Sequence, residues 1–327
     1  MWPTLYRTEV ASLDDKLNYC FIDSLLIVDQ ATRLIAIQLN MGAQDIQEEH
    51  FNRAVDVLME KPPFWSRVRC YCQDGFSEFI WTFILVLFGD GVVAQVVLSR
   101  GTKGEFQSIN WGWGIGVMMG VYCGGKPKLP IYALAQLLGA MAAAAVIYGN
   151  YKAAINIFEG GANLRTVTGP NATAGVFSTY PAAFMSTTGM FFSEFIASSI
   201  LQFSLYAMLD TDNIGAEPLL PIGLFFLVFG IGACFGWETG YAINPARDFG
   251  PRLVAFMLGY GTEVWTSGHH YFWVPIVAPA CDCLFGGFLY DIFIFTGESP
   301  INEPMFGLVK YLRKQRSVNG RSDVVHA

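Results

Sequence analysis

Charged residues are scarce in this sequence. Asp, Glu, Lys and Arg together make up 14% of the 327 residues, whereas soluble domains carry about 25%. Hydrophobic residues make up 53% of the chain, and the mean hydropathy is +0.39. The shortage of charge argues against a large soluble enzyme with an apolar core and favours an integral membrane protein.

The sequence also lacks a surplus of positive charge and lacks grouped cysteines. The net charge of −7 argues against nucleic acid as a partner. The seven cysteines are scattered, and neither Cys70 with Cys72 nor Cys281 with Cys283 has the spacing and the His neighbours of a zinc site. No secretory signal peptide is visible. We therefore expect no metal and no cofactor.

Long hydrophobic runs are what the sequence does contain. Each is close to the length of about 20 residues that a bilayer demands of a helix. The six runs are 75–98, 108–123, 129–149, 188–209, 219–236 and 271–296. They predict an all-α integral membrane protein with a transmembrane domain at 75–298. The remaining segments are read as a partly disordered cytosolic extension, 1–74, and a cytosolic tail, 299–327.

Lys and Arg residues set the expected orientation. They gather before the first run and after the last, at Lys61, Arg67, Arg69, Lys310, Arg313, Lys314, Arg316 and Arg321. By the positive-inside rule both termini are cytosolic, and residues 150–187 lie outside. There Asn171, in Asn-Ala-Thr, is a possible glycosylation site or an unused sequon.

The two halves of the membrane domain resemble each other. Ser77-Glu78-Phe79-Ile80 opens the first run, and Ser193-Glu194-Phe195-Ile196 opens the fourth. Three helices per half would place the copies in opposite orientations, an inverted 3+3 repeat with its functional site at the midplane. A Glu in a membrane span is costly. We expect Glu78 and Glu194 to accept hydrogen bonds from non-helical loops; the alternative is that both meet interfacial water.

The most informative segment runs from Gly240 to Leu253. Asn244 followed by Pro245 predicts a capped helix start, and the helix that follows, to about Met257, is too short to span. A short helix of this kind fits a re-entrant half-helix that lines a cavity. Its positive end repels cations, while Asn244 and Arg247 offer donors to neutral polar molecules. Nothing here is a nucleophile, a base or a metal ligand, so no enzyme activity is expected.

Asn-Pro-Ala-Arg-Asp-Phe-Gly-Pro, at 244–251, resembles the second signature of the aquaporins, or major intrinsic proteins. Asp248 after the Arg is similar to the glycerol-conducting branch, and residues 295–300 are similar to fungal members. The resemblance covers about 75–298. It implies a passive channel for glycerol, water and other small neutral solutes, formed by a homotetramer in the plasma membrane.

The resemblance also assigns residues to roles. The pore motif is Asn244, Pro245 and Ala246, and the selectivity filter is Trp113, Gly232, Tyr241 and Arg247. Pore-loop support falls to Glu78, Glu194, Gln136 and Asp248. Gly where water-selective members usually place His, between two aromatic walls, resembles a glycerol filter. The alternative for Trp113 is an interfacial anchor beside Trp111.

One part of the family pattern is absent. The family carries a first Asn-Pro-Ala between spans two and three, where this sequence has residues 122–130 and is about two dozen residues shorter than in the second half. One re-entrant half-helix is thus deleted, and Glu78 would lose the loop it holds. We therefore expect weak or no conduction. The alternative functions are a non-conducting or regulatory subunit and, on the slight support of Asp282, a secondary transporter.

Overall fold

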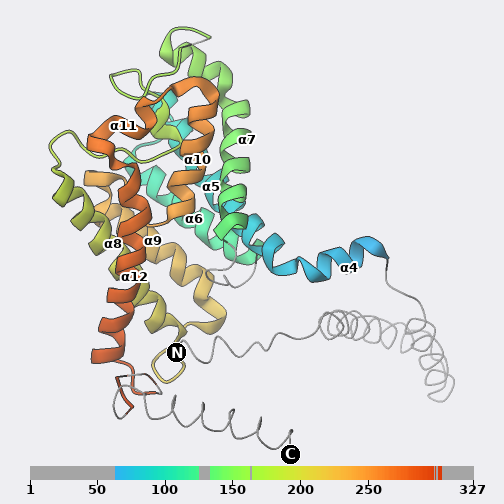
Figure 1. Ribbon diagram of the computed structural model, residues 1–327, viewed down its shortest axis with the longest axis vertical. Helices are drawn as coiled ribbons and strands as arrows, with labels where there is room; N and C mark the ends of the chain where they lie inside the picture. The colour runs from blue at the N-terminus through green and yellow to red at the C-terminus, as the bar shows by residue number, and fades with distance from the viewer. Residues whose placement is uncertain (1–62, 125–132, 163, 298, 300, 304–327) are drawn as a thin grey trace, which may run out of the picture. The chain divides into compact units, whose positions relative to one another are not determined.

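The computed structural model describes residues 63–124, 133–162, 164–297, 299 and 301–303 (Figure 1). The chain divides into two compact units, residues 1–76 and 77–327. All regular structure in the described ranges is helical. Most of the predicted extension 1–74 and tail 299–327 lies outside these ranges, so those boundaries stay predictions.

The described part of the first unit is short. It contains α4 (Phe64–Tyr71) and, after the single residue Cys72, the first residues of α5. No residue of α4 is buried.

The second unit is a bundle of long helices with shorter ones between them. Its α-helices are α5 (Gln73–Leu98, which begins in the first unit), α6 (Phe106–Gly124), α7 (Ala133–Glu159), α8 (Thr187–Leu209), α9 (Leu220–Thr239), α10 (Pro245–Ala255), α11 (Glu263–His270) and α12 (Val274–Phe293). The connections contain η1 (Ala174–Val176), η2 (Glu217–Leu219), η3 (Phe256–Tyr260) and η4 (Tyr271–Trp273).

Five helical segments are long and apolar enough to cross a membrane. They contain α5, α7, α8, α9 and α12. The second predicted span corresponds to α6, a helix of 19 residues, but α6 is not among these five because its apolar sequence is diluted by glycine and by polar residues such as Gln107 and Asn110. Several helices in the described part of the chain are therefore suited to crossing a membrane, and the sixth span stays a prediction.

The helix α7 is longer than predicted. The apolar run ends at 149, but the helix continues to Glu159. Asn150 and Lys152 end the hydrophobic pattern without ending the helix, because neither residue breaks helical hydrogen bonding. The added turns carry Glu159 to a buried position in the connection that follows.

Close packing between α5 and α6 depends on glycines spaced four residues apart on α6. Cβ atoms added at Gly116, Gly120 and Gly124 would lie 2.8, 2.9 and 2.6 Å from carbonyl oxygens of α5. Glycine at this spacing lets two helix backbones approach closely in a membrane. The bulky side chain of Trp81 on α5 is accommodated against Gly120 and Gly124.

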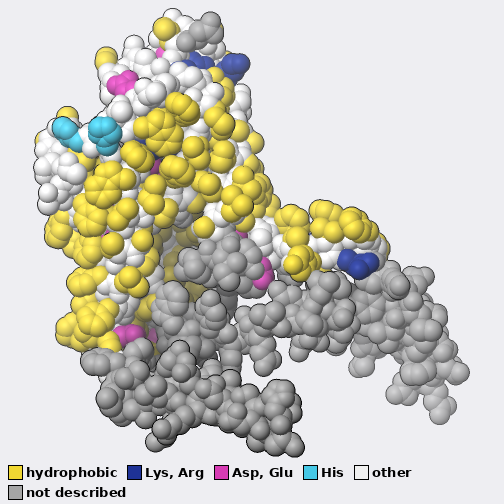
Figure 2. Space-filling model, in the orientation of Figure 1, with side chains coloured by type: hydrophobic (Ala, Val, Ile, Leu, Met, Phe, Trp, Pro, Cys, Tyr) yellow, Lys and Arg dark blue, Asp and Glu magenta, His cyan; other side chains and the backbone are white. Residues whose placement is uncertain are grey.

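The helices pack in pairs, some within one half of the chain and some between the two halves. The helix α8 packs on α12 and on α9, while α6 packs on α9 and α10 packs on α7 (Figure 1). The short helix α10 thus lies against a helix of the first half. Figure 2 shows hydrophobic side chains over most of the visible face of this bundle, as expected for a surface in contact with lipid.

Candidate functional site

The short helix α10 begins with the cap that the sequence predicted. The side-chain oxygen of Asn244 accepts hydrogen bonds from the backbone N–H groups of Ala246 at 2.9 Å and Arg247 at 3.2 Å. Pro245 occupies the first helical position and is exposed, while Asn244 is half-buried. The helix ends at Ala255, slightly earlier than predicted. A partial positive charge at its start therefore faces accessible space.

A buried carboxylate holds the loop before α10. Oε1 of Glu194 accepts from the N–H of Ala242 at 3.0 Å, and Oε2 accepts from the N–H of Ile243 at 2.9 Å. The hydroxyl of Tyr271 donates to Oε1 at 3.0 Å. Tyr241 and Ile243 have φ values of +39° and +42°, which β-branched and bulky residues adopt only under constraint. The hydrogen bonds to Glu194 provide that constraint.

A second buried carboxylate ties α10 to the segment before α8. Oδ2 of Asp248 accepts from the backbone N–H and the hydroxyl of Thr179, at 2.8 and 2.6 Å. Arg252 donates to both oxygens of Asp248 and to the carbonyls of Thr179 and Val264. Burial raises the pKa of the neighbouring Tyr180 to about 12, despite the Arg252 guanidinium 4.8 Å from its ring. The phenol therefore stays neutral beside this ion pair.

Two of the predicted filter residues are stacked. The guanidinium carbon of Arg247 lies 4.0 Å from the centre of the Trp113 ring. Both are nearly buried, at 7% and 3% exposure, whereas Trp111 is 50% exposed. A burial this deep does not fit a lipid-facing anchor at Trp113. A Cβ at Gly89 would lie 2.2 Å from the same ring, so glycine there makes room for the indole.

The other two predicted filter residues touch each other. The ring of Tyr241 lies against Gly232, where an added Cβ would be 2.6 Å from the tyrosine Cζ. The Tyr241 hydroxyl donates to Oδ1 of Asn110 at 2.7 Å. Asn110 is fully buried in α6 and was not predicted as a site residue. The sequence did contain one signal for it, because Asn110 is a lone amide side chain inside an apolar run.

Glu78, which was expected to lose the loop it holds, has a hydrogen-bond partner on α7. Nε2 of Gln136 donates to Oε2 of Glu78 at 2.7 Å. The contact forms because α5 and α7 pack closely, with Gly139 of α7 against the carbonyl of Phe79. Gln136, assigned to pore-loop support, therefore satisfies this carboxylate directly.

Asp282 is a buried carboxylate that its described surroundings leave unsatisfied. It is fully buried in α12, and within the described ranges neither carboxylate oxygen has a hydrogen-bond partner. A coupling site of a secondary transporter would need a second carboxylate or a cation as a partner. In the described ranges no such group is hydrogen-bonded to Asp282.

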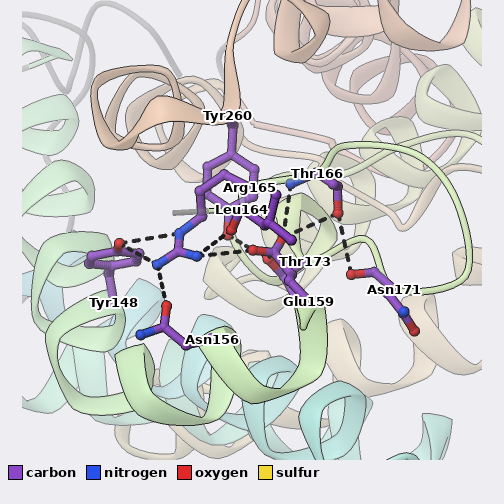
Figure 3. A network of polar contacts seen from close by, with 9 residues as sticks. All are labelled: Tyr148, Asn156, Glu159, Leu164, Arg165, Thr166, Asn171, Thr173 and Tyr260. Carbon is purple, nitrogen blue, oxygen red and sulfur yellow. Dashed lines mark hydrogen bonds and ion pairs between the residues drawn. The ribbon is translucent and has the colours of Figure 1, made fainter. Parts of the chain in front are cut away.

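The connection after α7 is held by a network around a buried ion pair (Figure 3). Nη1 of Arg165 lies 3.0 Å from Oε2 of Glu159, with both side chains buried. Arg165 also donates to Tyr148 and Asn156 of α7. Oε1 of Glu159 accepts from the N–H of Thr166 and from the hydroxyls of Thr166 and Thr173.

The predicted glycosylation sequon lies in this network. Asn171 is exposed, and its side-chain oxygen accepts from Arg100 at 3.1 Å. Thr173, the third sequon residue, is fully buried between Glu159 and the hydroxyl of Tyr260, at 2.7 and 2.5 Å (Figure 3). A glycan at Asn171 would therefore have to be added before this connection folds.

Replacing Glu159 by glutamine is expected to lower stability strongly. The Arg165 charge would stay buried without its counter-ion, and breaking a buried pair costs about 3–5 kcal/mol. Thermal unfolding of the purified protein in detergent measures the effect. Glu263→Gln is the matched control, because Glu263 is exposed and accepts a single bond, from Thr168. Equal melting temperatures for the two variants would contradict the importance of this network.

The long apolar helices pack with a short capped helix, and the polar residues of that short helix are buried. These features define a multi-pass membrane protein with an internal polar site. The sequence model described as major intrinsic protein matches residues 125–290. The chain belongs to the major intrinsic protein family of membrane channels.

Fungal aquaglyceroporins are among the similar proteins. The chain is 63% identical over 297 residues to a probable aquaglyceroporin-2 of Gibberella zeae, covering 83% of this chain and 88% of the relative. It is 59% identical over 277 residues to aquaglyceroporin-9 of Botryotinia fuckeliana, covering 78% and 61%. The solved structure of the aquaglyceroporin from Plasmodium falciparum matches with a TM-score of 0.59 and 27% identity, covering 68% of this chain and 97% of that one.

The Gibberella alignment also measures what this chain lacks. Since 83% of 327 residues is about 271, about two dozen of the 297 aligned positions have no residue in this chain. This number agrees with the shortfall expected between spans two and three.

Proposed function

We propose that this protein is a passive channel for glycerol, water and other small neutral solutes, with Trp113, Gly232, Tyr241 and Arg247 as its selectivity filter. The observation that carries the proposal is the stacking of Arg247 on Trp113 at the capped start of the short helix α10. Nη1 of Arg247 is buried and has no hydrogen-bond partner within the described ranges. The described part of the protein leaves this donor unsatisfied, so a solute hydroxyl that reached it would complete its hydrogen bonding.

The two aromatic rings suit a molecule with an apolar carbon chain on one side and hydroxyls on the other. Trp113 and Tyr241 would contact the carbons, while Arg247 and the Asn244 amide donate to oxygen. The absence of a side chain at Gly232 leaves room for Tyr241 to lie back toward Asn110. The positive start of α10 would oppose the passage of cations. Neutral polyols fit this combination better than ions do.

We further infer a six-span inverted repeat that assembles as a homotetramer in the plasma membrane with both termini cytosolic. Equivalent packing supports the repeat, because α5 contacts α6 and α7 in the first half as α8 contacts α9 and α12 in the second. The names of the fungal relatives support glycerol as a solute.

A second candidate function, and the one that matches the expectation of weak or no conduction, is a subunit that does not conduct alone and regulates intact relatives. The asymmetry of the two halves favours it. Residues 240–273 separate α9 from α12 and contain α10 and α11, whereas α6 and α7 are separated by 125–132 alone. A connection this short cannot hold a matching half-helix, so half of the usual pore lining would be missing.

Uptake of radiolabelled glycerol in cells without their own glycerol channels separates the candidates. A channel is expected to give uptake that rises linearly with concentration and is unchanged when the proton gradient is collapsed. Saturable, gradient-dependent uptake would contradict a channel. Uptake that changes only when an intact relative is co-expressed would favour the regulatory subunit.

A further inference from the structure

The helix α4, just before the first membrane span, exposes an unusual set of side chains. Phe64 is 79% exposed, Trp65 62% and Tyr71 64%. Arg67 and Arg69 are exposed as well. Figure 2 shows hydrophobic and basic side chains together on this helix. Large aromatic side chains left this open on a short helix mark an interaction surface.

The sequence sorts these side chains onto two faces. At about 100° per residue, Phe64, Val68 and Tyr71 fall on one side of the helix, with Trp65 at its margin. Arg67 and Arg69 fall on the two flanks of this apolar face. Ser66 and Cys70 lie opposite it. The apolar face is thus bordered by one guanidinium on each side.

Aromatic residues flanked by cations suit the interface of a bilayer. Trp and Tyr place an apolar ring among acyl chains and a polar edge among headgroups. Arginine can extend its stem along an apolar surface and keep its charge at the level of lipid phosphates. A helix with these faces lies in the membrane plane rather than across it.

Chain continuity fixes which surface α4 can reach. Cys72 alone separates α4 from α5. Its N–H donates to the carbonyl of Val68, and its carbonyl accepts from the N–H of Phe76, each at 2.9 Å. Helical hydrogen bonding therefore continues from one helix into the next. Because α5 is a membrane span, α4 is tethered to that membrane's surface. Arg67 and Arg69 place this end on the cytosolic side, where anionic lipids gather.

We propose that α4 is an interfacial helix that binds the anionic lipid surface of the cytosolic leaflet through its aromatic face and its flanking arginines. The attachment orients the start of α5 and provides a lipid-sensitive contact separate from the solute path. No part of it depends on what the protein conducts.

Photo-cross-linking of the full-length protein in vesicles tests this proposal. Benzoylphenylalanine is placed at Trp65, on the aromatic face, or at Ser66, on the opposite face, in phosphatidylcholine vesicles with and without phosphatidylserine. Lipid adducts, identified by mass, are expected to be several-fold more abundant from position 65. Phosphatidylserine should raise the yield from position 65, and the double variant Arg67→Gln, Arg69→Gln should abolish that rise.

The other occupants of the aromatic face give different products. Adducts between two chains would overturn the proposal in favour of a protein interface, and adducts to residues 1–62 would overturn it in favour of an internal contact. Equal yields of lipid adducts from positions 65 and 66 would also contradict it. So would a yield from position 65 that is the same with and without phosphatidylserine. Glycerol flux is not a readout, so failure here leaves the channel proposal untouched.

Discussion

Glycerol flux is expected to fall by about tenfold or more when Gly232 is replaced by alanine. The new Cβ would lie 2.5 Å from Oδ1 of Asn110 and 2.6 Å from Cζ of Tyr241. The tyrosine ring must then move into the solute path and lose its bond to Asn110. A narrowed path raises the barrier to the solute, and about 1.4 kcal/mol on a barrier slows passage tenfold. Flux into liposomes that contain the purified variant measures the effect.

Gly230→Ala is the matched control for this experiment. It lies on the same helix, and an added Cβ there meets nothing within 4 Å. The control should conduct like the unmodified chain and melt at the same temperature. If both alanine variants conduct equally, the solute does not pass beside Gly232, and the assignment of the filter is wrong.

Replacing Glu194 by glutamine is expected to unfold the segment before α10. The carboxylate accepts from two backbone N–H groups and one hydroxyl. The glutamine amide has only one oxygen to accept with, and its NH2 group would face N–H or O–H groups that also donate. Each buried group left unsatisfied costs about 1–3 kcal/mol. The positive φ values at Tyr241 and Ile243 would then be unsupported. The melting temperature in detergent should drop sharply, and flux should be lost with it.

Glu105→Gln provides the comparison, because Glu105 is exposed at the start of α6 and removing its charge should leave stability within error. A Glu194→Gln variant that melts like Glu105→Gln would mean that the loop is held by other contacts. Loss of flux without loss of stability would instead place Glu194 in the solute path.

The sequence predicted those parts of the site that are encoded locally. The cap at Asn244 follows from Asn followed by Pro, since both the side-chain acceptor and the missing N–H act within one turn. The role of Glu194 follows from the cost of a carboxylate in a membrane span. Each inference needed a residue and its immediate neighbours, and the structure contains both contacts.

Contacts between distant segments could not be predicted in the same way. Asn110 and Thr179 acquire their roles from partners far along the chain, Tyr241 and Asp248, and nothing near them in the sequence identifies those partners. The length of α7 was underestimated because hydropathy reports the membrane boundary, not the helix end. The partner of Glu78 was missed because Gln136 approaches it through close packing of α5 and α7.

The most direct test of the proposed function is stopped-flow light scattering from liposomes that contain this purified chain alone. After a glycerol gradient is imposed, vesicles with the protein should re-swell faster than protein-free vesicles of the same lipid, and Gly232→Ala should remove the difference while Gly230→Ala keeps it. Re-swelling at the rate of protein-free vesicles, with the protein folded and inserted, would contradict a glycerol channel and leave the regulatory subunit in its place.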